Sequence, residues 1–169
     1  MLSYMPSRQH AVNAPAPEKR PSRPPRSPAG DAVSVLVLRV LRLAGRLTEA
    51  GDVLARPAGH TSARWQVLAG AESERATVAD VARALGLARQ SVQRVADVLA
   101  DEGWVTWRDN PAHARAKLLA LTDKGRLALR QIQEAQRAWA DELGARIGAK
   151  ELAKATAVLD ALLGALDAA

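Results

Sequence analysis

The spacing of apolar residues predicts two short helices joined by a tight turn, over 77–85 and 88–101. Apolar residues recur three and four positions apart, as on one helix face: Val78, Val81, Ala82 and Leu85, then Val92, Val95, Ala96 and Leu99. Thr77 can cap the first helix, and Gly86 tolerates the positive φ with which helices commonly end. Leu87 is expected to fill the corner between them. This order is that of a helix-turn-helix.

After Gly103 the pattern changes to the two-residue alternation of β-strands. In the first strand Val105 and Trp107 share one side, and in the returning strand Leu119 and Leu121 do so. Turn-forming residues lie between the strands, as do the basic ones at the tip: Asp109, Asn110 and Pro111, then His113, Arg115 and Lys117. The pattern predicts a wing, which completes a winged helix-turn-helix over 61–121.

The second helix carries polar side chains that suit DNA on the face left free by its apolar stripe: Arg89, Gln90, Ser91, Gln93 and Arg94. Arginine pairs with guanine and glutamine with adenine in the major groove, while Arg115 and Lys117 at the wing tip could reach the minor groove. The acidic residues come later in the helix, where they are expected to face away from DNA or to lie beyond the groove: Asp97, Asp101 and Glu102. A solvated helix face is the alternative, but the position between a turn and a wing favours DNA binding.

Long amphipathic helices flank this core, over 31–56 and 122–169. In the last helix, after Gly148, apolar residues alternate three and four apart, which is typical of a seam between helices. Packing within one chain is the alternative, but seams at both ends of the chain favour a homodimer. The predicted interface residues are Leu36, Val40, Leu152, Leu159, Leu162 and Leu166. The expected fold is mainly α with a small β-wing, a winged helix-turn-helix core flanked by long dimerisation helices.

Residues 1–30 differ in composition from the rest of the 169-residue chain. They hold seven of the nine prolines and contribute +4 of the net charge of +6, so they are expected to form a disordered basic tail. The tail could add non-specific DNA affinity or be a passive leader, and the passive reading is favoured. The sequence has no cysteine, no signal peptide and no apolar run of membrane-spanning length, which together favour a cytoplasmic protein without membrane contact.

Catalytic and metal-binding motifs are missing from the sequence. The three histidines, His10, His60 and His113, have no second histidine or carboxylate at ligand spacing, and no phosphate-binding loop or nucleophile motif occurs. We therefore expect no enzyme activity, no catalytic residue, no metal and no cofactor. The alternative hypothesis for the function is a winged helix that serves as a protein-interaction module without specific DNA binding.

The run from Thr61 to Gly125 resembles the MarR family of bacterial transcriptional regulators. The resemblance rests on TSARWQVLA, VADVARALGLARQSVQRVADVLADEGWV and DNPAHARAKLLALTDKG. It implies one domain over 31–169, a winged-helix homodimer and a repressor of transcription that binds a palindromic operator. By position, 89–94 would be the recognition face and Arg115 the wing-tip arginine. Members commonly have Asp two residues before that arginine and often Arg beside it, where this chain has His113 and Ala114.

The resemblance also implies a small aromatic or phenolic effector, bound between the dimerisation helices and the winged helix. Residues on the elements that border this cleft are Arg46, His60, Trp65 and Trp139. An aromatic wall with a cation would suit an aromatic carboxylate. Ordinary packing or surface exposure is the alternative for each of these side chains.

Overall fold

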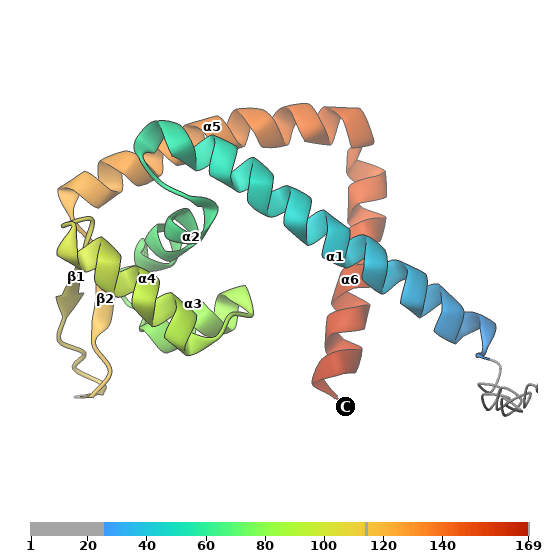
Figure 1. The fold of residues 1–169 in the computed structure, drawn as a ribbon, viewed down its shortest axis with the longest axis horizontal. Coiled ribbons are helices and arrows are strands. Elements are labelled where there is room, and N and C mark those ends of the chain that lie inside the picture. Colours follow the sequence, from blue (N-terminus) through green and yellow to red (C-terminus); the bar gives the residue numbers. More distant parts are fainter. Residues whose placement is uncertain (1–25, 114, 169) are drawn as a thin grey trace, which may run out of the picture. The chain divides into compact units, whose positions relative to one another are not determined.

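A computed structural model describes residues 26–113 and 115–168 of the chain. Its elements follow the order α1 (Pro28–Ala55), the 3-10 turn η1 (Arg56–Ala58), α2 (Ser62–Ala71), α3 (Val78–Leu85), α4 (Arg89–Asp101), β1 (Val105–Arg108), β2 (Leu118–Leu121), α5 (Asp123–Ile147) and α6 (Ala149–Asp167) (Figure 1). The fold is mainly helical with one two-stranded sheet, which confirms the predicted class. The boundary between the two units of the chain, at Arg39 and Val40, falls within the residues of α1.

Helix α1 begins three residues before the position that the apolar pattern predicted. The Ser27 hydroxyl accepts the N–H of Gly30 at 3.1 Å, and Pro28 opens the helix, where a backbone N–H has no partner within the helix. Residues 28–30 are therefore helical, and their assignment to a disordered tail is wrong. The rest of the predicted tail, up to residue 25, lies outside the described residues.

Hydroxyl side chains begin the helices of the core. Thr61 caps α2 and Thr122 caps α5, each by accepting a backbone N–H from the third helical residue. At α3 the hydroxyl of Thr77 accepts the N–H of Asp80 at 3.2 Å, and the Asp80 carboxylate accepts the N–H of Thr77 at 3.0 Å. Gly86 ends α3 in the left-handed region, at φ 63°, and turns the chain toward α4.

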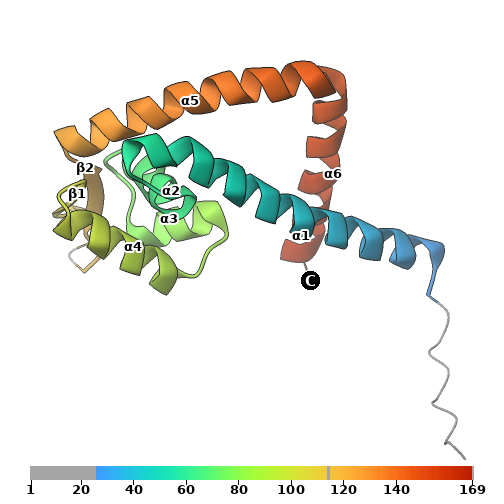
Figure 2. The ribbon, with the colours of Figure 1, turned by 45° about the horizontal axis from the view of Figure 1, so that its top comes forward.

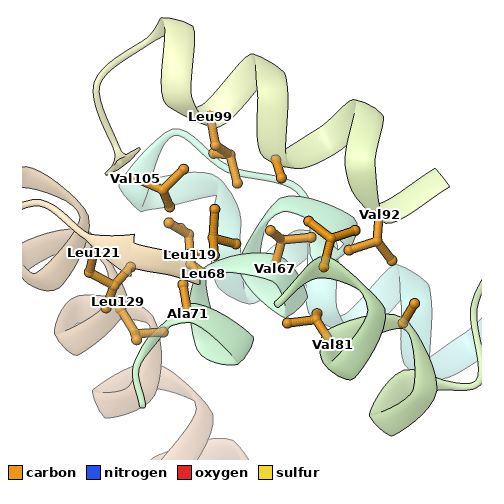
Figure 3. Close-up of a cluster of buried hydrophobic side chains, with 13 residues drawn as sticks. Val67, Leu68, Ala71, Val81, Val92, Leu99, Val105, Leu119, Leu121 and Leu129 are labelled. Atoms are coloured by element: carbon orange, nitrogen blue, oxygen red, sulfur yellow. The ribbon is translucent and has the colours of Figure 1, made fainter. Parts of the chain in front are cut away.

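The core lies between α2, α3, α4, the wing and the start of α5 (Figure 3). Its buried residues are Val67, Leu68, Ala71, Val78, Val81, Ala82, Val92, Ala96, Leu99, Val105, Leu119, Leu121 and Leu129. The predicted stripes of both short helices are largely buried, whereas Leu85 and Leu87 are exposed by 37% and 45%. The expectation for these two residues is wrong, because they flank the turn at Gly86, where the chain leaves the core.

The wing is an antiparallel pair in which Val105 faces Leu121 and Trp107 faces Leu119. Val105 is buried and Trp107 half-buried, as the alternation predicted. In β2, Leu119 and Leu121 are buried and so is Ala120, which the alternation placed on the opposite side. Helices α2 and α5 both contact β2. A backbone bond from Leu119 N–H to the Ala76 carbonyl, 2.9 Å long, ties the wing to the start of α3.

Helices α5 and α6 meet at a bend at Gly148, whose φ is 93° (Figure 2). The apolar side chains of α6 are uncovered in the single chain: Leu159 is 37% exposed, Leu163 60% and Leu166 67%. Apolar surface of this extent on one helix is typical of a contact with another helix. Within the described ranges, none of the helices has the length and apolar content needed to cross a membrane.

Candidate nucleic-acid interface

Helix α4 presents the polar side chains that the sequence singled out for DNA. Its buried stripe turns Arg89, Gln90, Ser91 and Arg94 to solvent, with Gln93 half-buried beside them. The residue before the helix, Ala88, has no side-chain acceptor, and the first turn carries no acid. The first amides of α4 are therefore open to an anion, whose charge the helix dipole also favours.

The wing tip and α4 together line a groove of about 400 Å³. From α4 come Arg89, Gln93 and Asp97, from the wing Trp107, Arg115, Ala116 and Lys117, and from the start of α3 Thr77, Val78 and Ala79. The structure thus brings the predicted wing cations to the same groove as two of the predicted base-reading side chains, Arg89 and Gln93. Sequence reasoning missed Trp107 as a groove residue, since its alternation indicated only packing. The wing residue Ala114 lies outside the described residues.

A second hollow, of about 610 Å³, is lined by α4 alone: Arg89, Gln90, Gln93, Arg94 and Asp97. Asp97, which the sequence analysis did not place among these side chains, therefore lines both hollows beside Arg89 and Gln93. Arg89, Gln93 and Asp97 are spaced four residues apart, which places them along one helix face. That spacing was visible in the sequence and would have identified Asp97. Ser91, although exposed, lines neither hollow.

An ion-pair network around Glu74 joins strand β1 of the wing to α5. The Glu74 carboxylate binds the guanidinium of Arg108 on β1 at 2.6 Å and that of Arg126 on α5 at 2.8 Å. Glu74 has a φ of 54°, in the region that non-glycine residues seldom adopt. The two arginines therefore hold a strained residue whose carboxylate joins the wing to α5. Sequence spacing carried no signal for this network, because its members come from separate elements.

The buried side chain of His60 lies against the base of the wing. Its ring meets Trp104 edge-on, with centroids 4.5 Å apart, and the Lys124 ammonium lies 3.7 Å from the centroid of the Trp104 ring. Arg64 forms an ion pair with Glu102, whose carboxylate also accepts the indole N–H of Trp104. Burial, followed by the positive charge of Arg64, lowers the pKa of His60. The lowered pKa favours the neutral imidazole, whose ring packs on Trp104.

An apolar cavity of about 540 Å³ lies between the C-terminal half of α1, α2, α3 and α5. Trp65 and Trp139 line it, as the effector hypothesis expects, together with apolar residues that include Leu47 and Leu54. The other two residues of that hypothesis lie elsewhere. Arg46 points to solvent in an ion pair with Glu49, and His60 packs on Trp104. The polar residues that line the cavity are the neutral Thr48, Ser62, Gln66 and Gln136.

Within residues 26–113 and 115–168, no three side chains of histidine, cysteine, aspartate or glutamate gather as a metal site would require.

Sequence comparison assigns the core to a known family. A family model described as the MarR family matches residues 59–116. An uncharacterized protein of Mycobacterium tuberculosis strain H37Rv is 45% identical over 104 residues, which span 62% of this chain and 73% of that protein. A protein of Mycobacterium bovis, also uncharacterized, matches with the same identity and coverage.

Solved structures share the fold. The M. tuberculosis transcriptional regulator MosR, in complex with DNA, is 28% identical with a TM-score of 0.63, and the match covers 77% of this chain and 96% of MosR. A MarR/EmrR family transcriptional regulator from Acinetobacter sp. ADP1 has a TM-score of 0.72 at 15% identity, covering 80% of this chain and 97% of that chain. Together with the matching core residues, these likenesses show that the chain belongs to the MarR family of transcriptional regulators.

Proposed function

We propose that this chain binds double-stranded DNA sequence-specifically as a homodimer and acts as a ligand-responsive repressor. The observation that carries the proposal is the groove in which Arg89 and Gln93 of α4 meet Arg115 and Lys117 of the wing. Cations that neutralise phosphates, beside guanidinium and amide groups that pair with base edges, are what specific DNA binding requires. The related regulator MosR has been crystallised with DNA.

The geometry suggests that α4 and the wing contact different parts of the DNA. The N-terminal half of α4 would enter the major groove, where Arg89, Gln90, Gln93 and Arg94 meet base edges and Ser91 meets a base or a phosphate. Arg115 and Lys117 would lie over the adjacent minor groove or its phosphates. In a twofold dimer built on α6, two copies of this surface would read an inverted repeat with half-sites about 10 to 11 base pairs apart.

The experiment that tests this function is selection of binding sequences from random DNA, followed by titration over a range of salt. Enrichment of an inverted repeat and an affinity that falls steeply with salt would support the proposal, because phosphate contacts release counterions. A winged helix that only binds proteins would enrich no sequence, and that result would refute the proposal.

We expect substitutions in α4 and in the wing to change DNA binding in different ways. Arg94→Ala should lower affinity about 5- to 150-fold for sites with the preferred base and relax preference at that position, since a bidentate base contact is lost. Arg115→Ala should weaken all sites alike and make the salt dependence shallower by about one unit, while base preference persists. Fluorescence anisotropy on matched and mutated operators at two salt concentrations measures both effects.

The matched control is Arg137→Ala, which removes an exposed arginine of α5 outside both hollows. It should change neither base preference nor, beyond a small uniform loss, affinity. If Arg115→Ala behaved like this control, the wing would not contact DNA.

We further propose that the apolar cavity is the effector site. Its two indoles and uncharged amides and hydroxyls suit a neutral phenolic or aromatic molecule rather than the aromatic carboxylate that a cation would bind. The cavity lies beside α3 and α5, so a ligand there can favour one arrangement of these helices and thereby alter DNA affinity.

This ligand class can be tested with a pair of probes that differ mainly in charge, 4-hydroxybenzamide and 4-hydroxybenzoate. Calorimetry should show at least about tenfold tighter binding of the amide, because a desolvated carboxylate would find no cation among the lining residues. Trp139→Ala should weaken binding by at least about tenfold through lost ring contact, whereas Arg46→Gln should not. Tighter binding of the benzoate, reversed by Arg46→Gln, would contradict this assignment.

A further inference from the structure

One carboxylate lies within the surface proposed to meet DNA. Asp97 is exposed and borders both hollows, each of which also contains Arg89 and Gln93. A carboxylate there repels phosphates. General affinity for DNA therefore disfavours a carboxylate at this position, which directs attention to the contact that Asp97 makes.

The contact that Asp97 makes is with a proposed base-reading side chain. The Gln93 amide Nε2 donates to Asp97 Oδ1 at 2.9 Å. An ionised carboxylate only accepts hydrogen bonds, so the amide end that faces Asp97 must be the NH₂ group. Asp97 thereby takes one of the two amide N–H groups and fixes the orientation of the amide, so that the Gln93 carbonyl oxygen is held on the side away from Asp97.

We propose that Asp97 is a positioning residue that determines the base specificity of Gln93. With its NH₂ group held by Asp97, Gln93 presents an acceptor to the major groove and favours a base with an exocyclic amino group, adenine or cytosine. This inference rests on the proposed DNA-binding function and adds to it the class of base selected at one position of each half-site.

The donor and acceptor pattern of the major groove explains the preference. Adenine N6 and cytosine N4 are donors, whereas guanine and thymine present the acceptors O6, N7 and O4. An acceptor base under Gln93 would face both the amide oxygen and the lone pairs of Asp97. A free glutamine could rotate its amide to donate instead, but rotation here would break the bond from Nε2 to Asp97.

The test uses the full chain and a selected operator. The base beneath Gln93 is located as the position where Gln93→Ala removes the preference among the four bases. At that position, the wild-type protein should bind adenine or cytosine about tenfold more tightly than guanine or thymine, the scale of one base-edge contact. Asp97→Ala should reduce this ratio to about threefold or less, while preferences at other positions persist.

Asp101→Ala is the matched control, because it removes the same charge from the exposed C-terminal end of the same helix, beyond the residues lining both hollows. Both variants should bind DNA more tightly in general, through reduced repulsion of phosphates. Only Asp97→Ala should alter the ranking of bases. In the double variant Gln93→Ala with Asp97→Ala, the ranking should equal that of Gln93→Ala alone, since Asp97 acts through Gln93.

Two results would overturn the inference. If Asp97→Ala raised affinity for all four bases equally, as Asp101→Ala should, the carboxylate would have only a general electrostatic effect. A wild-type preference for guanine or thymine beneath Gln93 would contradict the orientation of the amide. Both results leave the proposed function intact. A wild-type protein that selects no DNA sequence would instead refute the proposed function and the inference together.

Discussion

Leu159→Glu should convert a dimer into monomers and abolish operator binding. Leu159 lies within the apolar stripe of α6, which the single chain leaves exposed. In a twofold interface each substitution occurs twice, and burying an unpaired carboxylate costs several kcal/mol. A loss of about 4 kcal/mol raises the dimer dissociation constant about a thousandfold. Sedimentation equilibrium at micromolar concentration measures the assembly, and anisotropy with the selected operator measures DNA binding.

Ala157→Glu is the matched control for this change. Residue 157 is exposed on the same helix but is turned about 160° from residue 159, at about 100° per residue. This variant should remain dimeric and bind DNA. If the wild-type protein sediments as a monomer at micromolar concentration, or if Leu159→Glu remains dimeric, the stripe of α6 is not the dimer interface.

The elements that the sequence predicted correctly are those specified by local signals. The cap at Thr77 and the turn at Gly86 act over a few residues, so their types and spacing identify them without knowledge of the fold. The buried stripes of α3 and α4 follow from periodicity for the same reason. The early start of α1 was missed because Pro28 was counted with the prolines of the tail, although proline also suits the first turn of a helix.

The features that the sequence did not predict depend on contacts between distant segments. Ala120 lies on the side of β2 opposite Leu119 and Leu121, yet it is buried as well, which the alternation alone did not indicate. Glu74 joins the wing to α5 through arginines 34 and 52 positions away. His60 and Arg46 belong to elements that border the cavity, but only the fold reveals that their side chains point elsewhere.

Gly125 lies in the first turn of α5, where a backbone carbonyl from a distant part of the chain approaches it closely. The sequence identified it only through resemblance, as the last residue of the LTDKG run. The structure supplies the reason: the Trp104 carbonyl occupies the space where a Cβ of residue 125 would lie, well within van der Waals contact. That carbonyl also accepts the Thr122 N–H at 3.1 Å, which docks α5 on the base of the wing.

We therefore expect Gly125→Ala to destabilise the protein strongly. The added methyl group collides with backbone rather than with a flexible side chain, so α5 must move away from the wing. Overpacking of this kind costs about 3 kcal/mol, which lowers the melting temperature by about 6 to 12 °C for a chain of this size. Calorimetry measures the shift, and anisotropy well below the melting temperature should still show weakened operator binding, because the wing has lost its support.

Gly144→Ala separates this steric effect from the general effect of replacing glycine in α5. A Cβ at residue 144 meets nothing within 4 Å among the described residues, and alanine favours a helix over glycine by up to about 1 kcal/mol. This variant should unfold at an equal or slightly higher temperature than the wild type and bind the operator normally. If Gly125→Ala were as stable as Gly144→Ala, the close approach of α5 to the Trp104 carbonyl would not exist in solution, and the wing would be held by the Glu74 ion pairs and strand pairing alone.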